Sequence, residues 1–217
     1  MTFISRRDLL KGVAVAPFTA PVARAFQARG SRSADRLALQ TREPLENLTA
    51  SEMDILEAIV ARLIPTDENG PGAREARAAH YIDRALGSAL ASSRQAYTAG
   101  LAAVDQYARS SRGVQFTALS PADQDALLTD IEKGTAAGFT GSSTAFFNLV
   151  LSHTHQGTFG DPHYGGNAHF IGWDLIAYPG VRTMVSGGDQ KRLEANDLKP
   201  NHKSAYDYDG FTKTSGD

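Results

Sequence analysis

The sequence contains no cysteine among its 217 residues. Disulfide bonds, covalent attachment of haem, thiolate-bound iron–sulfur clusters and cysteine nucleophiles are therefore excluded for this chain. Strand patterns are missing as well, because no stretch alternates apolar and polar residues in the way that a half-buried strand requires. Apolar runs are short, and none approaches the roughly 20 residues that cross a bilayer. These absences favour an all-α protein that is held together by packing or by a partner.

An excess of positive charge is also missing. The chain has 22 Lys and Arg against 24 Asp and Glu, a formal net charge of −2. Nucleic-acid-binding domains concentrate basic residues, so we expect no nucleic-acid partner. The dinucleotide fingerprint G-x-G-x-x-G does not occur at Gly165-Gly166-Asn167, which follows no predicted strand. We therefore expect no cofactor bound by this chain itself.

The N-terminus has the features of an export signal. Arg6 and Arg7 precede a short apolar stretch at 12–23, which resembles a twin-arginine signal. The small-x-small pattern at 23–25 predicts cleavage after Ala25. A basic tail without an export role is the alternative. Export through the twin-arginine translocase would place the protein in the periplasm or on the periplasmic face of the inner membrane.

Composition divides the remaining chain into three parts. Residues 26–47 are polar and lack apolar periodicity, which predicts a flexible leader. Residues 48–185 contain the helical patterns and are predicted to form one domain. Residues 186–217 are polar again, and we expect this tail to be disordered or to lie along a partner.

Apolar periodicity predicts a small all-α domain of about five to six helices. A Thr49-Ala-Ser-Glu52 capping box starts the first helix, and Pro65 ends it. Further helices are predicted over 73–90, over 93–109 and from Ser120-Pro121 to Gly134, and a fifth contains Phe146 and ends at Gly157. The predicted core residues of the first four helices are Met53, Leu56, Ile59, Val60, Leu63, Ala79, Ile82, Leu86, Leu90, Tyr97, Leu101, Val104, Ala108, Leu127, Leu128 and Ile131.

A long segment rich in glycine and aromatic residues follows the fifth helix. Residues 146–182 hold four of the six histidines and the only tryptophan. Asp, Pro, Gly and Asn cluster at 160–167, and these residue types form turns. A short amphipathic piece follows at 168–176. Long loops inside compact domains are usually functional or disordered, so we expect an ordered, functional loop here.

The same residues carry a family resemblance. The run comprises Thr154, Gly157, Phe159, Asp161, Pro162, Tyr164, Gly165, Gly166 and Asn167, then Gly172-Trp173 and Tyr178-Pro179-Gly180. It resembles the signature of the gluconate 2-dehydrogenase subunit 3 family, which comprises the small subunits of membrane-associated flavin sugar dehydrogenases. The resemblance extends back to 62–67 and 70–73, and covers roughly Leu48 to Arg182.

The resemblance implies a non-catalytic accessory subunit. Its partner would be a large FAD-dependent oxidoreductase of the glucose–methanol–choline type that acts on a sugar or sugar acid. Electrons would pass from the FAD to a haem c of a cytochrome c subunit or to another acceptor. This chain would contribute stability, maturation and export of the flavoprotein. The expected structural and partner-contacting residues are Phe159, Asp161, Pro162, Tyr164, Gly165, Gly166, Asn167, Trp173, Tyr178 and Pro179.

The histidines and aspartate of the loop leave an alternative open. An independent periplasmic metal-binding protein or enzyme could use imidazoles from His163 or His169 together with Asp161. His153 and His155 are two positions apart, so on a helix they point in nearly opposite directions and cannot share one metal ion. A further alternative is that these side chains only hydrogen-bond the backbone of the loop. The aromatic residues could equally fill the core or contact a partner.

Overall fold

The computed structural model describes residues 44–212. Arg6, Arg7, the predicted cleavage site at Ala25 and most of the predicted leader lie outside the described residues. Within 44–212 the chain forms helices and turns, and its β-type pairing is a single isolated bridge between Asp67 and Gly70. The predicted all-α class is therefore confirmed.

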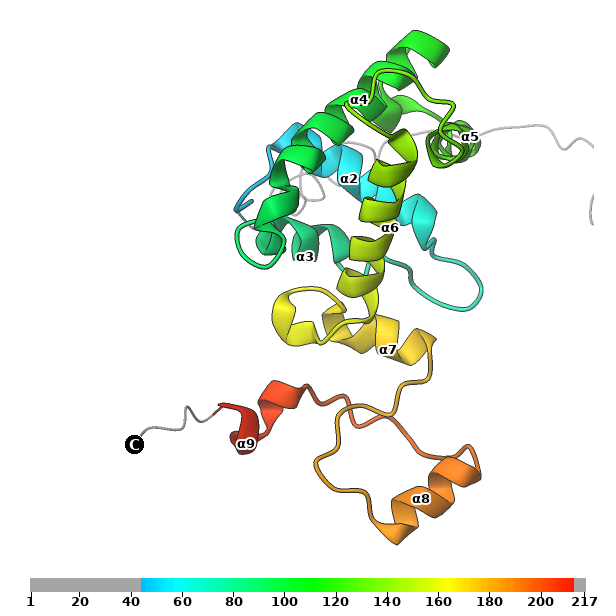
Figure 1. Ribbon diagram of the computed structural model, residues 1–217. Helices are drawn as coiled ribbons and strands as arrows, with labels where there is room; N and C mark the ends of the chain where they lie inside the picture. Colours follow the sequence, from blue (N-terminus) through cyan, green and yellow to red (C-terminus); the bar gives the residue numbers. More distant parts are fainter. Residues whose placement is uncertain (1–43, 213–217) are drawn as a thin grey trace, which may run out of the picture. The chain divides into compact units, whose positions relative to one another are not determined.

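Five helices form the core. They are α2 (Ala50–Leu63), α3 (Ala78–Ala85), α4 (Arg94–Arg112), α5 (Pro121–Glu132) and α6 (Ser143–Phe159). Helix α6 contacts each of the other four (Figure 1). The predicted core residues are buried in one cluster, with Leu63 and Leu90 partly buried at its edge. Each fully buried large aliphatic side chain contributes about 1.5–3 kcal/mol to folding, so this cluster is the main source of stability.

Local capping explains where three of these helices start. The Thr49 hydroxyl accepts from the Glu52 N–H, and the Glu52 carboxylate accepts from the Thr49 N–H, so the predicted capping box is formed. Ser120 caps α5, with Pro121 in its first turn. Ser142 caps α6 by accepting from the Ala145 N–H. Each cap satisfies a donor that the helix itself leaves unpaired.

One predicted helix is shorter than expected. The span 73–90 is helical only over α3, because Arg77 adopts a left-handed backbone (φ 62°) and residues 86–90 form turns. Periodic alanines satisfy the helical pattern, yet the packing of residues 72–77 on the end of α2 bends them away from a helix. The Ala73 N–H, for example, donates to the Ile64 carbonyl.

The prediction that Gly157 caps the fifth helix is wrong. Helix α6 continues to Phe159 and ends at Gly160. Gly157 instead lies against α3, where a Cβ atom would come within 2.9 Å of the Ala78 backbone. The glycine therefore permits close packing of two helices, which a pattern of local residue types does not reveal.

A buried carboxylate fixes the beginning of the described chain. Asp83 of α3 is 4% exposed, and accepts hydrogen bonds from the backbone N–H groups of Glu46, Asn47 and Leu48. Arg94 donates to the side chain and carbonyl of Asn47. These contacts connect the segment before α2 to both α3 and α4.

Shorter elements follow α6. They are η4 (Pro162–Tyr164), η5 (Ala168–Phe170), α7 (Ile171–Leu175), α8 (Gly187–Glu194), η6 (Ala205–Asp207) and α9 (Asp209–Thr212). Helices α2 to α7 correspond to the predicted helices, whereas α8 and α9 lie in the tail that was expected to be disordered or bound to a partner. Across residues 44–212, no helix combines the length and apolar character that spanning a membrane requires.

Candidate functional site

Asn167 lies at the centre of the glycine–aromatic loop, which we define as residues 160–181. It is fully buried and has a left-handed backbone (φ 44°), a conformation that Asn tolerates better than most residues. Its N–H donates to the Gly157 carbonyl, and its amide donates to the Gly160 carbonyl. Its side-chain oxygen accepts from the Gly172 N–H. One side chain thus joins the end of α6 to the start of α7.

The two adjacent glycines meet different requirements. Gly165 has φ +95°, which a side chain would strain. Gly166 has no such angle, but it is buried so closely against α6 that a Cβ atom would collide with the Gly157 carbonyl. Gly165 is therefore needed for its backbone angle and Gly166 for close approach.

Trp173 is part of the protein interior. It is 5% exposed, and its indole N–H donates to the Phe159 carbonyl at 2.9 Å. The rings of Phe170 and Tyr178 pack against it, with centroids 5.4 and 4.8 Å away. Of the expected loop aromatics, Tyr164 and Tyr178 are the exposed ones, at 52% and 37%. A partner could contact these two tyrosines, but not Trp173 without opening the loop.

Asp161 is a hydrogen-bond acceptor for two segments of the chain. Its carboxylate accepts from the His163 N–H within the loop, and from the Ser204 hydroxyl and the Ala205 N–H in the tail. Burial acts to raise the pKa of Asp161, but the hydrogen bonds from Ser204, His163 and Ala205 outweigh it, so the pKa lies below its ordinary value. The carboxylate is therefore charged at neutral pH, and Pro162 follows it in the first turn of η4.

The histidines are spread over different surroundings. His153 is buried in α6, where its Nδ1 lies 3.0 Å from the Tyr97 hydroxyl, and burial lowers its pKa. His163 is exposed, and its ring stacks on Tyr206 with centroids 3.6 Å apart. His155 and His169 are exposed. In the part of the chain that the structure describes, no three His, Asp or Glu side chains gather as metal ligands.

A dyad of His163 and Asp161 is not formed. The contact between these residues runs from the His163 backbone N–H to the carboxylate, while the imidazole faces Tyr206. The carboxylate oxygens are taken up by donors from the loop and the tail. The arrangement suits a structural turn, since a general base needs its partner on the imidazole ring.

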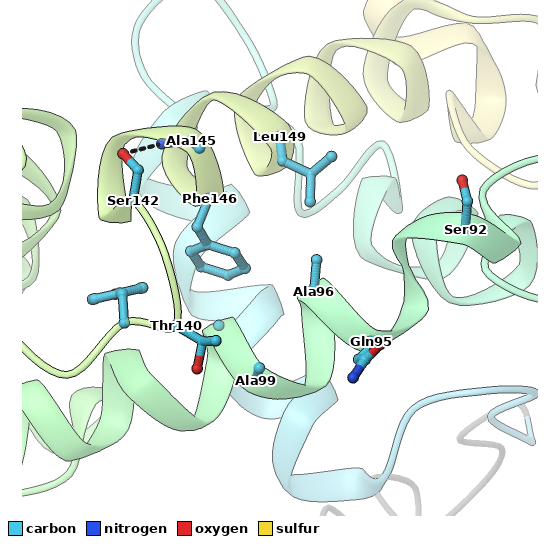
Figure 2. A pocket seen from close by; sticks show the side chains of 11 residues that line it. Ser92, Gln95, Ala96, Ala99, Thr140, Ser142, Ala145, Phe146 and Leu149 are labelled. Carbon is cyan, nitrogen blue, oxygen red and sulfur yellow. Dashed lines mark hydrogen bonds between the residues drawn. The ribbon is translucent and has the colours of Figure 1, made fainter.

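Sequence reasoning missed a groove between α4 and α6. It has a volume of about 610 Å³ and is lined by Ser92, Gln95, Ala96, Ala99, Gly100, Phe139, Thr140, Ser142, Ala145, Phe146 and Leu149. Figure 2 shows the side chains of Phe146 and Leu149 directed from α6 toward Ala96 of α4. Small residues at 96, 99 and 100 are the sequence signal that could have revealed it. None of the lining residues is charged.

Sequence reasoning also missed the tail residues that contact the loop. Ser204 and Ala205 hydrogen-bond Asp161, and Tyr206 stacks on His163. These pairs are about forty residues apart in the chain. No local pattern links such distant positions.

The fold and the geometry of the loop indicate the class of protein. It is an all-α domain whose distinctive residues build an ordered loop. A protein-family comparison then identifies the family, because gluconate 2-dehydrogenase subunit 3 matches residues 50–180. The chain belongs to this family. Comparisons with curated proteins and with solved structures gave no match.

Proposed function

We propose that this chain is the non-catalytic small subunit of a periplasmic FAD-dependent sugar or sugar-acid dehydrogenase. The observation that carries the proposal is the family match over 50–180, which extends from α2 to the end of the Tyr178-Pro179-Gly180 turn. The family is named for a subunit of a dehydrogenase, so a partner chain that performs the oxidation is expected. That partner would be a flavoprotein of the glucose–methanol–choline type, with a cytochrome c subunit or another molecule as electron acceptor.

The loop supports an assembly role over a catalytic one. Its buried members, Asn167 and Trp173, use their polar atoms on the chain's own backbone. Its exposed members, Tyr164 and Tyr178, are of a residue type that is enriched at interface hot spots. The proposed contribution of this chain is to stabilise the flavoprotein, to assist its maturation and to carry it through the twin-arginine translocase.

Co-purification tests the proposal. The full-length chain, co-expressed with a flavoprotein of the glucose–methanol–choline type from the same organism, should purify as a complex with a flavin absorption spectrum and dehydrogenase activity. The chain expressed alone should be helical by circular dichroism and show neither flavin absorption nor activity with sugars. A flavin spectrum that survives purification of the isolated chain would overturn the assignment.

Loop variants distinguish assembly from chemistry. Gly166→Val and Trp173→Ala should lower the yield of the assembled complex, because the first collides with α6 and the second removes a buried ring. The complex that still forms should keep nearly the same KM and the same kcat per flavin, since the chemistry takes place in the other chain. His163→Ala should be mild in yield.

The opposite result would assign the loop a part in the reaction. A Trp173→Ala or His163→Ala variant that assembles normally but loses kcat per flavin would place this loop in the chemistry or in electron transfer. Metal analysis of the isolated chain addresses the independent metal-binding alternative, which requires stoichiometric zinc, iron or copper. Such a metal content would contradict the accessory role.

A further inference from the structure

The chain returns to the loop after passing through α8. Residues 201–208, which we call the strap, lie outside the matched family segment. The first half of the strap pairs with the end of the loop: the Val181 N–H donates to the Lys203 carbonyl, and the Asn201 N–H donates to the Pro179 carbonyl. The Asn201 amide and the Tyr208 hydroxyl both donate to the Val181 carbonyl. The exit from the loop is therefore tied by four hydrogen bonds.

The middle of the strap binds the entry to the loop. Ser204 is buried, and its hydroxyl donates to Asp161 at 2.6 Å, while the Ala205 N–H donates to the other carboxylate oxygen at 3.0 Å. The Tyr206 ring stacks on His163, and its hydroxyl lies 2.9 Å from that of Tyr164. Three consecutive strap residues thus engage the start of the loop.

One strap residue contacts the middle of the loop. The ring of His202 stacks on Phe170 with centroids 5.1 Å apart, and its Nε2 lies 2.7 Å from the Asp174 carboxylate. The strap therefore touches the entry, the middle and the exit of one loop.

The loop needs such support because its backbone is strained. His169, Phe170 and Ala177 are not glycines, yet their φ angles are 56°, 64° and 54°. Left-handed conformations are unfavourable for these residue types, and they persist only where the surroundings determine them. Such over-determined segments concentrate at functional sites.

We propose that the strap holds the glycine–aromatic loop in the conformation that binds the flavoprotein subunit. This proposal rests on the proposed function. Asp161, Ser204 and Tyr206 fasten the entry side, and releasing them frees the loop without unfolding the α2–α6 core. The strap thereby acts as a positioning segment for the exposed Tyr164 and Tyr178.

The experiment weakens the contacts between the strap and the loop by substituting strap residues in the full-length chain. The test variant is Ser204→Ala with Tyr206→Ala, which removes the hydroxyl and the stacked ring. The matched control is Ser204→Thr with Tyr206→Phe, which keeps a hydroxyl and an aromatic ring at the same positions. The thermal unfolding temperature of both double variants, measured by circular dichroism, should stay close to that of the wild type. Neither Ser204 nor Tyr206 belongs to the hydrophobic core.

The first readout is limited trypsin digestion of the isolated protein. Lys191 and Arg192 lie in the exposed helix α8 and should be cut first in every variant. Cleavage after Lys203 requires local release of the strap, so it should be about tenfold faster in the alanine variant than in wild type or the control. An unchanged rate would show that these side chains do not fasten the strap.

The second readout is association with the flavoprotein subunit. The alanine variant should dissociate from the complex about tenfold faster than the control, with kcat per flavin unchanged in the complex that remains. If the alanine variant is cleaved faster after Lys203 but dissociates from the flavoprotein subunit at the same rate as the control, the proposal is overturned. The proposed function would then still stand. Failure of the wild-type chain to associate would instead refute the proposed function and, with it, the role of the strap in binding.

Discussion

At the scale of single residues, His153 combines burial with a contact to the hydroxyl of Tyr97. It stacks on Tyr97, and the two side chains share a hydrogen bond inside the core. Burial raises the pKa of Tyr97, so its hydroxyl stays protonated and can donate to a neutral imidazole. Burial also lowers the pKa of His153, so the folded protein favours the uncharged ring.

The free energy of unfolding should therefore fall in mildly acidic solution. Above about pH 6.5, the ordinary pKa of histidine, His153 is neutral in both the folded and the unfolded chain and contributes no pH dependence. Below that pH the unfolded chain binds a proton that the folded chain does not, so stability should drop by up to about 1.4 kcal/mol per pH unit until the folded pKa is reached. Urea unfolding at pH 7.5 and 5.5 measures this loss.

His153→Gln should reduce that loss, because glutamine can bond Tyr97 but does not titrate. His155→Gln is the matched control, since His155 is exposed two residues further along α6. Equal pH dependence in the wild type and in both variants would assign the effect to other groups.

At the scale of elements, two helices begin with a capping box but lie in different surroundings. Thr49 and Glu52 form a capping box at α2, and Ser186 and Asp189 form one at α8. Helix α2 supplies five buried residues to the core, whereas α8 has no buried residue. An isolated helix of eight residues is marginal in water, so α8 depends strongly on its cap.

The same substitution should therefore have different effects. Thr49→Ala should lower the global free energy of unfolding by about 1 kcal/mol, because loss of this cap weakens a core helix. Ser186→Ala should leave global unfolding unchanged and reduce only the local protection of α8. Urea titration and amide hydrogen exchange measure the two quantities. A global loss in Ser186→Ala would show that α8 belongs to the cooperative core.

At the scale of the whole molecule, the proposed export role joins the predicted N-terminal signal to the helical domain. Arg6→Lys with Arg7→Lys should retain this chain in the cytoplasm, because twin-arginine recognition reads paired guanidinium groups. The flavoprotein subunit should be lost from the periplasmic fraction at the same time. Fractionation with activity assays and immunoblots of both chains gives the measurement.

The control for export is a conservative change outside the pair, such as Lys11→Arg. It preserves the charge and both arginines of the predicted signal, so both chains should reach the periplasm. Normal export of the flavoprotein in the paired lysine variant would reject the carrier role and leave the stabilising role in place.

The sequence by itself determined the local features of this protein. Capping residues at Thr49, Ser120 and Ser142 act on N–H groups within the next three residues, and apolar periodicity selects the buried face of each helix. Gly165, at φ +95°, likewise depends on its own backbone angle. These interactions connect neighbours in the chain, so a linear pattern was sufficient to predict the all-α domain, its main helices and its ordered loop.

Only the tertiary structure decided how distant segments meet. Gly157 looked like a helix cap but serves the approach of α6 to α3, and Trp173 proved to be interior, where its indole reaches the Phe159 carbonyl. The tail was expected to be disordered or bound to a partner, yet Ser204 and Tyr206 bind the chain's own loop. Such contacts depend on the three-dimensional path of the backbone, which places donors and acceptors together regardless of their separation in sequence.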